Sequence, residues 1–585
     1  MTHAAGITAY RGRPGLALLS LLLVVLLSGC SFQLPSLRSD ANRTNVPGIA
    51  KAAGSSRLVI AVLGVHTTLQ SRTAGPGRRP GFDSLEELVS AGLAHIDDSA
   101  RLRPQLALAV PTLENGLWRI FPDGRMETTW KIKPGAKWHD GTAVTSEDFT
   151  LTAAVAQDPD VPAFRDPVYA YVDRVEAPDP ATIAVTWLRP YIEADRLFTS
   201  SGTGTVPLPS HILEPTYSAN KGEFLQHPHW AEQFVGTGPF RVTRWIPGSS
   251  VRLQAFDQYV LGRPNIDEIE VRFIPDPAAM LAGVRAGEVQ FVMGWGVSAE
   301  EAAQMRDQWR DGRADVGIDA WIAAFPQMLN PNPAVIGNAR FREALLLAID
   351  REEMAESIQH GVTPVADAFV NPTDPNYGLL ESRITRYEHD PRRAREVVEA
   401  LGYLRGAGGI YRDTAGQPLE VELRGNNSDI LESAMQAVGD YWRRLGLQVD
   451  LVGIPQMRAT DREYRATRPG FEVARHPADT TIDGLQRYHS SQVPQPSNNF
   501  AGTNRSRYAN RELDGLLEQY FATIPRQDRF EVLGRIVSHL SRELIPLPLF
   551  YDQRTALVSN RLLGAAARQG HGSTEAWNAE TWTLK

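Results

Sequence analysis

The sequence predicts an α/β fold divided between more than one domain, and three observations support this. At 585 residues the chain is too long for a single hydrophobic core. Short apolar segments with a period of two alternate with longer segments of helical period. Two segments, 269–292 and 419–452, have the order strand–helix–strand, which requires parallel strands and a right-handed crossover.

The first thirty residues have the pattern of a secretory signal. A flank with two arginines precedes an apolar stretch at 16–27, which is shorter than a membrane span, and Leu27-Ser-Gly-Cys30 follows. This tetrapeptide resembles a bacterial lipobox, whose cysteine is diacylated and becomes the new N-terminus. We therefore expect a signal peptide over 1–29, lipidation of Cys30 and a flexible tether over 30–56. An uncleaved N-terminal anchor is the alternative, and either arrangement places most of the chain outside the cytoplasm.

Composition excludes several classes of function. Cys30 is the only cysteine, so neither an intrachain disulfide nor a multi-cysteine metal site can form. Without residues 1–29 the chain carries 58 basic and 68 acidic residues. This negative balance disfavours nucleic acid or an anionic bilayer as the partner surface. No second apolar run approaches the length of a membrane span.

The elements of the first half follow from local patterns. The continuous apolar run at 58–62 is typical of a buried strand. Pro134-Gly135 and Asp140-Gly141 are turn signals, and Thr145 or Ser146 can cap a helix. In order, we expect a strand at 58–62, a helix at 84–93, strands at 126–132 and 137–138, a strand at 183–187 and a helix that begins within 208–213.

The second half repeats the alternation. Asp276 can cap a helix that begins at Pro277, and Asp350 can form a capping box with Glu353. In order, we expect a hairpin at 241–245 and 251–255, a strand at 269–273, a helix from 277 that Gly287 closes, a strand at 289–292, helices at 339–350, 350–361 and 390–402, a strand at 419–423, a helix at 428–445 and a strand at 447–452.

Three segments resemble one known family. Residues 129–149 contain Trp138-His-Asp-Gly141 followed by Thr145-Ser-Glu-Asp148. The second segment is Val235-Gly-Thr-Gly-Pro-Phe240, with Ala286-Gly-Glu288 further on, and the third is the helix pair at 339–351. In this order they resemble the extracellular solute-binding proteins of family 5, the oligopeptide, dipeptide and nickel receptors of ABC importers.

The resemblance implies a two-lobed periplasmic-binding-protein fold of type II, with an inserted domain and a ligand cleft between the lobes. Lobe I would be discontinuous and would include the C-terminal return, and the inserted domain would belong to its side. The expected limits are 57–105, 231–325 and 545–585 for lobe I, 106–230 for the inserted domain and 326–544 for lobe II.

The residues do not favour an enzyme or a resident cofactor. The sequence lacks a Gly-x-Ser-x-Gly elbow, a His-Glu-x-x-His helix and a P-loop. Gly236-Thr-Gly238 lacks a third glycine, and a proline follows it, so it indicates a turn. No metal ligand set is assigned. The pairs His227 and His229, and His476 and His489, keep metal binding open as an alternative.

The segment from Phe471 to Asp479 is the most suggestive for ligand binding. By resemblance, Asp479 matches the aspartate that pairs with the ammonium of a peptide N-terminus, and the strand before it pairs with the peptide backbone. His476 stands where the family often has tryptophan, and Ala478 lies between them. An ammonium enclosed in a cleft requires a charged partner. A solvated loop aspartate is the alternative for Asp479, and Asp483 is a rival four residues on.

Other residues are weaker candidates for the cleft. Val65 and His66 follow the first strand, Trp295 lies after a strand end, and Trp321 and Tyr551 lie where the chain should cross between lobes. Each could contact ligand or simply pack in the core. His139-Asp140-Gly141 is interpreted as a structural turn.

We therefore expect a lipid-anchored, monomeric solute-binding protein outside the cytoplasm, in the periplasmic space if the cell has two membranes. It would deliver a peptide or similar small solute to ABC permease subunits with a separate ATPase, without catalysis, cofactor or nucleic acid. The alternatives are a non-transport regulatory or envelope protein that reuses the fold, and a receptor for nickel or a metal chelate.

Overall fold

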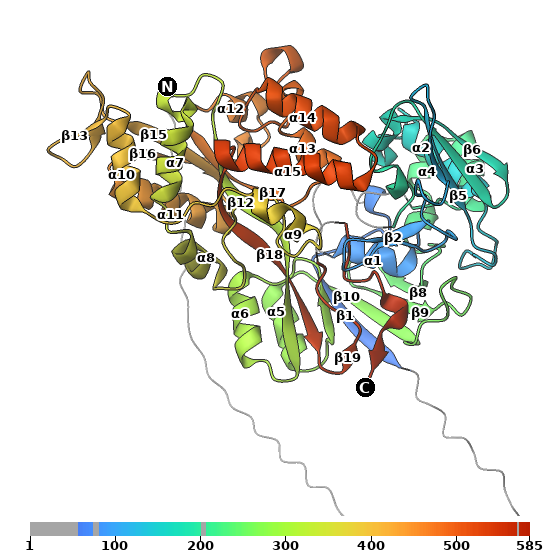
Figure 1. Cartoon of the computed structure of the whole chain (residues 1–585). Helices are drawn as coiled ribbons and strands as arrows, with labels where there is room; N and C mark the ends of the chain where they lie inside the picture. Colours follow the sequence, from blue (N-terminus) through green and yellow to red (C-terminus); the bar gives the residue numbers. More distant parts are fainter. Residues whose placement is uncertain (1–55, 74–80, 201–205, 570–571) are drawn as a thin grey trace, which may run out of the picture. The chain divides into compact units, whose positions relative to one another are not determined.

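The computed structural model describes residues 56–73, 81–200, 206–569 and 572–585 (Figure 1). The predicted signal peptide, the lipidation site Cys30 and the tether up to residue 55 lie outside the described residues. In the part of the chain that is described, no helix has the length and apolar content needed to cross a membrane.

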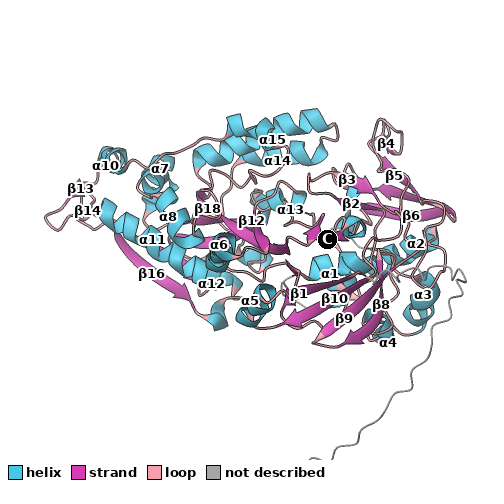
Figure 2. Cartoon of the chain, turned by 90° about the horizontal axis from the view of Figure 1, so that it is seen from below, coloured by secondary structure: helices cyan, strands magenta, loops and turns pink. Residues whose placement is uncertain are grey.

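A ten-stranded mixed sheet forms the centre of the structure, in the order β16-β15-β17-β12-β18-β11-β1-β10-β9-β8. Its two edge strands, β16 and β8, are labelled in Figure 2. The strands of this sheet are β1 (Arg57–Leu63), β8 (Phe240–Ile246), β9 (Ser250–Ala255), β10 (Glu268–Ile274), β11 (Phe291–Met293), β12 (Gly312–Pro326), β15 (Glu420–Asn426), β16 (Gln448–Ile454), β17 (Phe471–Pro477) and β18 (Leu547–Ser559).

Smaller sheets lie outside it. One has four strands in the order β4-β5-β7-β6, and three have two strands each. Their bounds are β2 (Ala94–Ile96), β3 (Leu102–Pro104), β4 (Trp118–Ile120), β5 (Met126–Lys131), β6 (Val172–Asp179), β7 (Thr182–Trp187), β13 (Leu404–Arg405), β14 (Tyr411–Arg412), β19 (Leu562–Leu563) and β20 (Thr583–Leu584). The four-stranded sheet and the helix α2 belong to the expected inserted domain.

Helices cover the sheets. The bounds are α1 (Phe82–Val89), α2 (Ser146–Gln157), α3 (Ser210–Ala219), α4 (Lys221–Leu225), α5 (Pro277–Arg285), α6 (Ala299–Gln308), α7 (Ala339–Leu347), α8 (Arg351–Gln359), α9 (Tyr377–Leu380), α10 (Pro391–Ala400), α11 (Asp429–Leu445), α12 (Arg462–Ala466), α13 (Ile482–Gln486), α14 (Arg511–Ala522) and α15 (Arg526–Glu543).

Both predicted strand–helix–strand units are present with parallel strands. Helix α5 packs on β1 and β10, and β1 pairs in parallel with both β10 and β11. Helix α11 packs on β15 and β16, which pair in parallel from Glu420 to Asn426. Asp276 caps α5 by accepting a hydrogen bond from the backbone N–H of Ala278. The α/β class predicted from the sequence is confirmed.

Some local predictions differ from the structure. The expected strand at 137–138 is a single bridge between Lys137 and Ala143, because the Asp140-Gly141 turn leaves no room for a longer ladder. The helix expected at 84–93 begins two residues earlier and ends at Val89. Val89, its last residue, lies against Gly236 and Gly238, where an added Cβ would lie 1.9 and 2.4 Å from Val89 backbone atoms.

Two of the motifs noted in the sequence contact each other. The His139 ring accepts a hydrogen bond from the backbone N–H of Gly236 at Nδ1 (3.1 Å), and its Nε2 lies 3.0 Å from the Gly238 carbonyl. Neutral imidazole with the proton on Nε2 satisfies both contacts. Burial lowers the pKa of His139 to about 4, so the ring stays neutral near pH 7. The interpretation of His139-Asp140-Gly141 as a structural turn agrees with this geometry.

Strands β12 and β18 join the two halves of the large sheet. They pair antiparallel from Gly312 with Ser559 to Ala324 with Leu547. The lobe limits expected from the sequence fall at the end of β12 and just before β18. These limits stay a prediction. The two strands that link the halves here are adjacent, and their pairing shifts register between Ile318 and Ala320 and between Ile322 and Ala323.

Candidate solute-binding site

Strand β17 positions the candidate site. It pairs with β12 over its whole length, so that His476 is opposite Trp321, and Trp321 is opposite Tyr551 on β18. Residues directly opposite in a ladder project to the same face of a sheet. Three of the predicted site residues therefore share one row across β17, β12 and β18.

A cavity of about 630 Å³ opens on this face. Among the described residues, its lining comes from 462–505, contributed by α12, β17, α13 and the loops that follow. The volume falls within the range of about 300–1,000 Å³ typical of small-molecule sites. The wall includes apolar residues such as Pro494 and Phe500, uncharged polar residues such as Gln492, and many charged side chains. The cavity is thus suited to a small solute with a polar group at one end.

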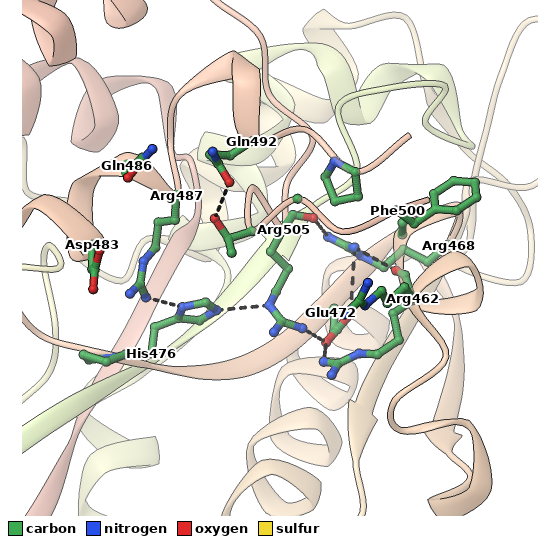
Figure 3. Close-up of a pocket in the computed structure, with 16 residues that line it drawn as sticks. Arg462, Arg468, Glu472, His476, Asp483, Gln486, Arg487, Gln492, Phe500 and Arg505 are labelled. Carbon is green, nitrogen blue, oxygen red and sulfur yellow. Dashed lines mark hydrogen bonds and ion pairs between the residues drawn. The ribbon is translucent and has the colours of Figure 1, made fainter. Parts of the chain in front are cut away.

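The charged wall consists mainly of arginines (Figure 3). We call the following group the cavity cluster: Arg462, Arg465, Arg468, Arg487, Arg505, Glu472, Asp483 and His476. Glu472 is 1% exposed and accepts hydrogen bonds at Oε1 from both Arg465 and Arg505. Arg468 Nη1 lies 3.8 Å from its Oε2. One carboxylate therefore serves three guanidinium groups.

The pKa of Glu472 is lowered by the three arginines around it. Burial alone would raise it, but Arg505, Arg468 and Arg465 outweigh burial and lower it to about 2. Burial, with Arg505 as a positive neighbour, lowers the pKa of Arg468 to about 10, against the attraction of Glu472. Both groups are charged near pH 7, and the wall has a net positive charge.

His476 lies between two arginines. Arg487 Nη1 lies 2.5 Å from its Nδ1, and Arg505 Nε lies 3.0 Å from its Nε2, as Figure 3 shows. The imidazole ring packs against Phe325 with ring centroids 4.5 Å apart. Burial, followed by the charges of Arg505 and Arg487, lowers the pKa of His476 well below its usual value. The ring is therefore neutral near pH 7.

Asp479, the predicted partner of a peptide ammonium, lies just beyond β17 and is 7% exposed. Its Oδ1 accepts hydrogen bonds from the backbone N–H of Thr481 (3.1 Å) and from the Thr481 hydroxyl (2.5 Å). That hydroxyl accepts in turn from the backbone N–H of Gly484 at the start of α13. Asp479 thus shapes the turn into α13, and its contact with a ligand stays a prediction.

Ala478 and Asp483 occupy neighbouring positions. Ala478 is buried beside Asp479, and its backbone N–H reaches the carbonyl of Asp319 at 3.5 Å. Asp483 is exposed and lies in the cavity wall. Of the two acidic residues weighed from the sequence, the rival Asp483 lines this cavity directly.

Trp295 lies on the other side of β17, in a second charged group. We call this group the crossing cluster: Arg475, Arg554 and Arg568 with Asp83, Asp319, Asp552 and Glu575. The guanidinium groups of Arg475 and Arg554 lie 4.8 and 5.5 Å from the centre of a Trp295 ring. These are cation–π distances. The indole is therefore tied to the ion pairs between β12, β17 and β18.

The remaining predicted residues are spread apart. Trp321 and Tyr551 are each 2% exposed, and the Tyr551 hydroxyl lies 3.0 Å from the carbonyl of Ala368 and 2.6 Å from that of Val370. His66 is buried between Phe82 and Phe273. Val65 is half exposed. In this arrangement Trp321, Tyr551 and His66 pack in the interior, and their role as ligand contacts stays a prediction.

Sequence reasoning missed the arginines. They come from α12, the loop after it, the end of α13 and the loop at 500–505, and each alone has the pattern of a solvated surface residue. The only available signal was their density, because six arginines occur between residues 462 and 505.

The histidines considered as metal ligands contact other groups of the protein. Nδ1 of His227 accepts a hydrogen bond from the backbone N–H of His229. His476 faces Arg487 and Arg505, while His489 Nδ1 bonds Ser491. Within the described ranges, no group of three or more His, Cys, Asp and Glu side chains is placed to hold a metal ion.

Comparison with known proteins identifies the family. The profile of the bacterial extracellular solute-binding proteins, family 5 (middle region), matches residues 109–490. The oligopeptide-binding protein AppA of Bacillus subtilis is 23% identical over 98% of this chain and 99% of its own. The heme-binding protein A of Haemophilus influenzae is 24% identical over 74% of this chain and 77% of its own.

Solved structures share the fold. The substrate-binding protein CtaP of Listeria monocytogenes aligns with a TM-score of 0.70 and 19% identity, over 91% of this chain and 99% of its own. An oligopeptide-binding protein of Thermus thermophilus, solved with a pentapeptide, aligns with a TM-score of 0.63 and 21% identity, over 90% and 96%. The resemblance noted in the sequence is confirmed. The chain belongs to the bacterial extracellular solute-binding proteins of family 5, a class of binding proteins rather than enzymes, and has their two-lobed mixed α/β fold.

Proposed function

We propose that this protein is the lipid-anchored solute-binding protein of an ABC importer. It captures a peptide or a chemically similar small solute outside the cytoplasm and delivers it to permease subunits that work with a separate ATPase. The observation that carries the proposal is the solute-sized cavity beside β17, in a chain that belongs to family 5. The names of its oligopeptide-binding relatives support a peptide as the solute.

The backbone of β17 supports a peptide in particular. Its pairing with β15 ends at Val473, while its pairing with β12 continues to Pro477. The segment Ala474–Pro477 therefore extends beyond its neighbour β15, next to the cavity wall at His476. An extended peptide can add to such a strand through main-chain hydrogen bonds, which are independent of its side chains.

The cavity lining, 462–505, falls within the expected lobe II, and β12 and β18 connect this half of the sheet to the other half. The segment expected as the inserted domain, 106–230, contacts the segment expected as lobe II, 326–544, beside the cavity. Glu193 Oε1 accepts from the backbone N–H of Ile482 at 3.4 Å, and Arg529 Nη1 lies 3.5 Å from the Ile192 carbonyl. We propose that the halves close on the solute, that closure tightens these contacts and excludes water, and that the polar contacts to the solute become stronger.

The substitution Asp479→Asn tests the peptide assignment. Asparagine keeps an oxygen that can accept from Thr481, so the turn into α13 is retained, while the negative charge is removed. We expect the affinity for a tripeptide with a free amino terminus to fall by about 1.5–3 kcal/mol, the range for a charge-assisted hydrogen bond. Isothermal titration calorimetry measures this loss.

The matched control is Asp483→Asn, which removes the charge of the rival acidic residue. An N-acetylated tripeptide should bind the parent and Asp479→Asn equally, because it carries no ammonium. Equal affinity of Asp479→Asn and the parent for the free-amine peptide would remove Asp479 from the site. The same loss in Asp483→Asn alone would transfer the role to that residue.

A further inference from the structure

The cavity cluster contains more positive charge than its own acidic residues balance. Five arginines line the cavity, against Glu472 and Asp483. Arg465, Arg468 and Arg505 already converge on Glu472. A wall with this composition attracts anions, because the low-dielectric surroundings strengthen the field of each uncompensated charge.

The contacts of His476 add to the shortage of hydrogen-bond acceptors in the cavity wall. A neutral imidazole has one nitrogen that accepts and one that donates. Here both ring nitrogens face arginine N–H groups, at 2.5 and 3.0 Å. Only one of these contacts can be a hydrogen bond, and the other sets an N–H donor against an N–H donor. The arginine N–H group that faces the protonated ring nitrogen therefore lacks an acceptor, which an anion can supply.

Two more guanidinium N–H groups behind this wall lack an acceptor in the described part of the chain. Arg465 Nε and Arg468 Nε are buried, and neither has a hydrogen-bond partner among the described residues. The Arg468 side chain is 1% exposed, so bulk water does not satisfy it. A solute in the cavity does not reach these buried N–H groups, but their charge adds to the positive field that an oxyanion there meets.

From these observations we infer that the cavity binds the oxyanion group of the solute, and that the protein selects solutes with a net negative charge. This rests on the proposed function and adds to it the chemical class of the solute. The planar guanidinium groups suit two-pronged hydrogen bonds to a carboxylate or a phosphate. The apolar wall of Pro494 and Phe500 covers the uncharged part of the molecule.

Calorimetry with two matched peptides tests the selection. Glu-Ala-Glu and Gln-Ala-Gln have nearly the same size, free amino terminus and backbone, and differ by two negative charges. We expect the acidic peptide to bind at least tenfold more tightly at 50 mM NaCl, and the difference to shrink at 300 mM as salt screens the charges. Succinate and inorganic phosphate, used as competitors, show whether a carboxylate or a phosphate fits better.

The substitution Arg487→Gln tests whether the preference for the acidic peptide arises in this cavity. Its guanidinium contacts His476 and carries no bond to Glu472, so we expect the fold to be unchanged in a thermal melt. The acidic peptide should lose at least tenfold in affinity, and the neutral peptide should change less than twofold. The control Arg392→Gln removes an arginine that is 85% exposed on α10, and it should leave both affinities unchanged.

The outcomes separate this inference from the proposed function. Equal binding of the two peptides, or an acidic peptide unaffected by Arg487→Gln, overturns the inference and leaves the binding function standing. Binding of phosphate or succinate without either peptide supports the anion selection and removes the peptide from the proposed function. Binding of none of the four probes contradicts both.

Discussion

The cavity cluster and the crossing cluster use the same kinds of side chain in different proportions. In the crossing cluster, three arginines meet four carboxylates, and each arginine has at least two acidic partners. In the cavity cluster, five arginines meet two carboxylates. Strand β17 carries both, because Arg475 projects to one face and His476 to the other. The balanced charges of the crossing cluster hold segments of the chain together. The surplus positive charge of the cavity cluster can instead be balanced by an anionic ligand.

The partners in the crossing cluster are distant in sequence. Asp319 on β12 bonds Arg475 on β17 at 2.8 Å and also pairs with Arg568 near the C-terminus. Arg554 on β18 bonds Glu575 at 2.7 Å and Asp83 on α1 at 3.1 Å. Burial would raise the pKa of Asp319, but Arg568, Arg475 and Arg554 lower it. The cluster therefore stabilises the region where β12 and β18 connect the halves of the sheet.

The largest effect on this comparison is expected from Asp319→Ala. It removes a buried carboxylate and leaves Arg475 and Arg568 short of a partner. Breaking a buried ion pair in this way costs about 3–5 kcal/mol of unfolding free energy. Urea unfolding of the parent and the variant measures the difference. The control Asp440→Ala removes an exposed partner of Arg443 and should cost less than about 1 kcal/mol. A loss below about 1 kcal/mol for Asp319→Ala would mean that the crossing cluster does not stabilise the fold.

A smaller effect, with a different response to anions, is expected from Glu472→Gln. It leaves three arginines without their shared carboxylate, and we expect a loss of about 1–3 kcal/mol of unfolding free energy. Phosphate should restore part of this loss, because an anion that binds the folded state at ten times its Kd adds about 1.4 kcal/mol.

The response to phosphate should distinguish the variants of the two clusters. Phosphate should rescue Glu472→Gln and leave Asp319→Ala unchanged, measured by thermal melts with and without phosphate at constant ionic strength. If both variants respond equally, the cavity cluster has no particular affinity for anions.

The smallest effect is a dependence of stability on pH. Arg505, Arg487, Arg465 and Arg475 surround His476, and together with burial they keep it neutral in the folded state. The unfolded chain protonates this histidine below about pH 6.5. Because the unfolded state then binds more protons, stability falls as pH decreases below 6.5, by up to about 1.4 kcal/mol per pH unit from this group.

His476→Asn isolates that contribution. Urea unfolding between pH 7 and pH 5 should show a steeper loss of stability in the parent than in the variant. The other histidines are common to both proteins, so the difference between the two slopes reports His476 alone. Identical slopes would show that His476 titrates normally in the folded state.

Much of the fold followed from the sequence, for physical reasons that differ between elements. The units at 269–292 and 419–452 have a clear period and capping residues, and both formed as predicted. Strands β12 and β18 were not predicted from the sequence. The last ten residues of β12 are all buried, so they show no alternation of polar and apolar residues that could mark a strand.

The site also contains residues that the sequence predicted and residues that it did not. His476 was found because its position after Phe471 resembles a family pattern. Arg465, Arg487 and Arg505 were not, because nothing local distinguishes them from surface arginines. Only the folded chain brings α12, α13 and the loop at 500–505 to the same face of β17. A site built from charges on separate elements is set by tertiary structure.

The central claim is that this protein holds a small solute in the cavity beside β17 and leaves it chemically unchanged. Native mass spectrometry of the protein mixed with equimolar Glu-Ala-Glu tests this most directly. We predict a one-to-one complex that is lost in Arg487→Gln, and from which denaturation releases the peptide with its original mass. The absence of any complex with the acidic or the neutral peptide, or the release of a cleaved peptide, would contradict the account.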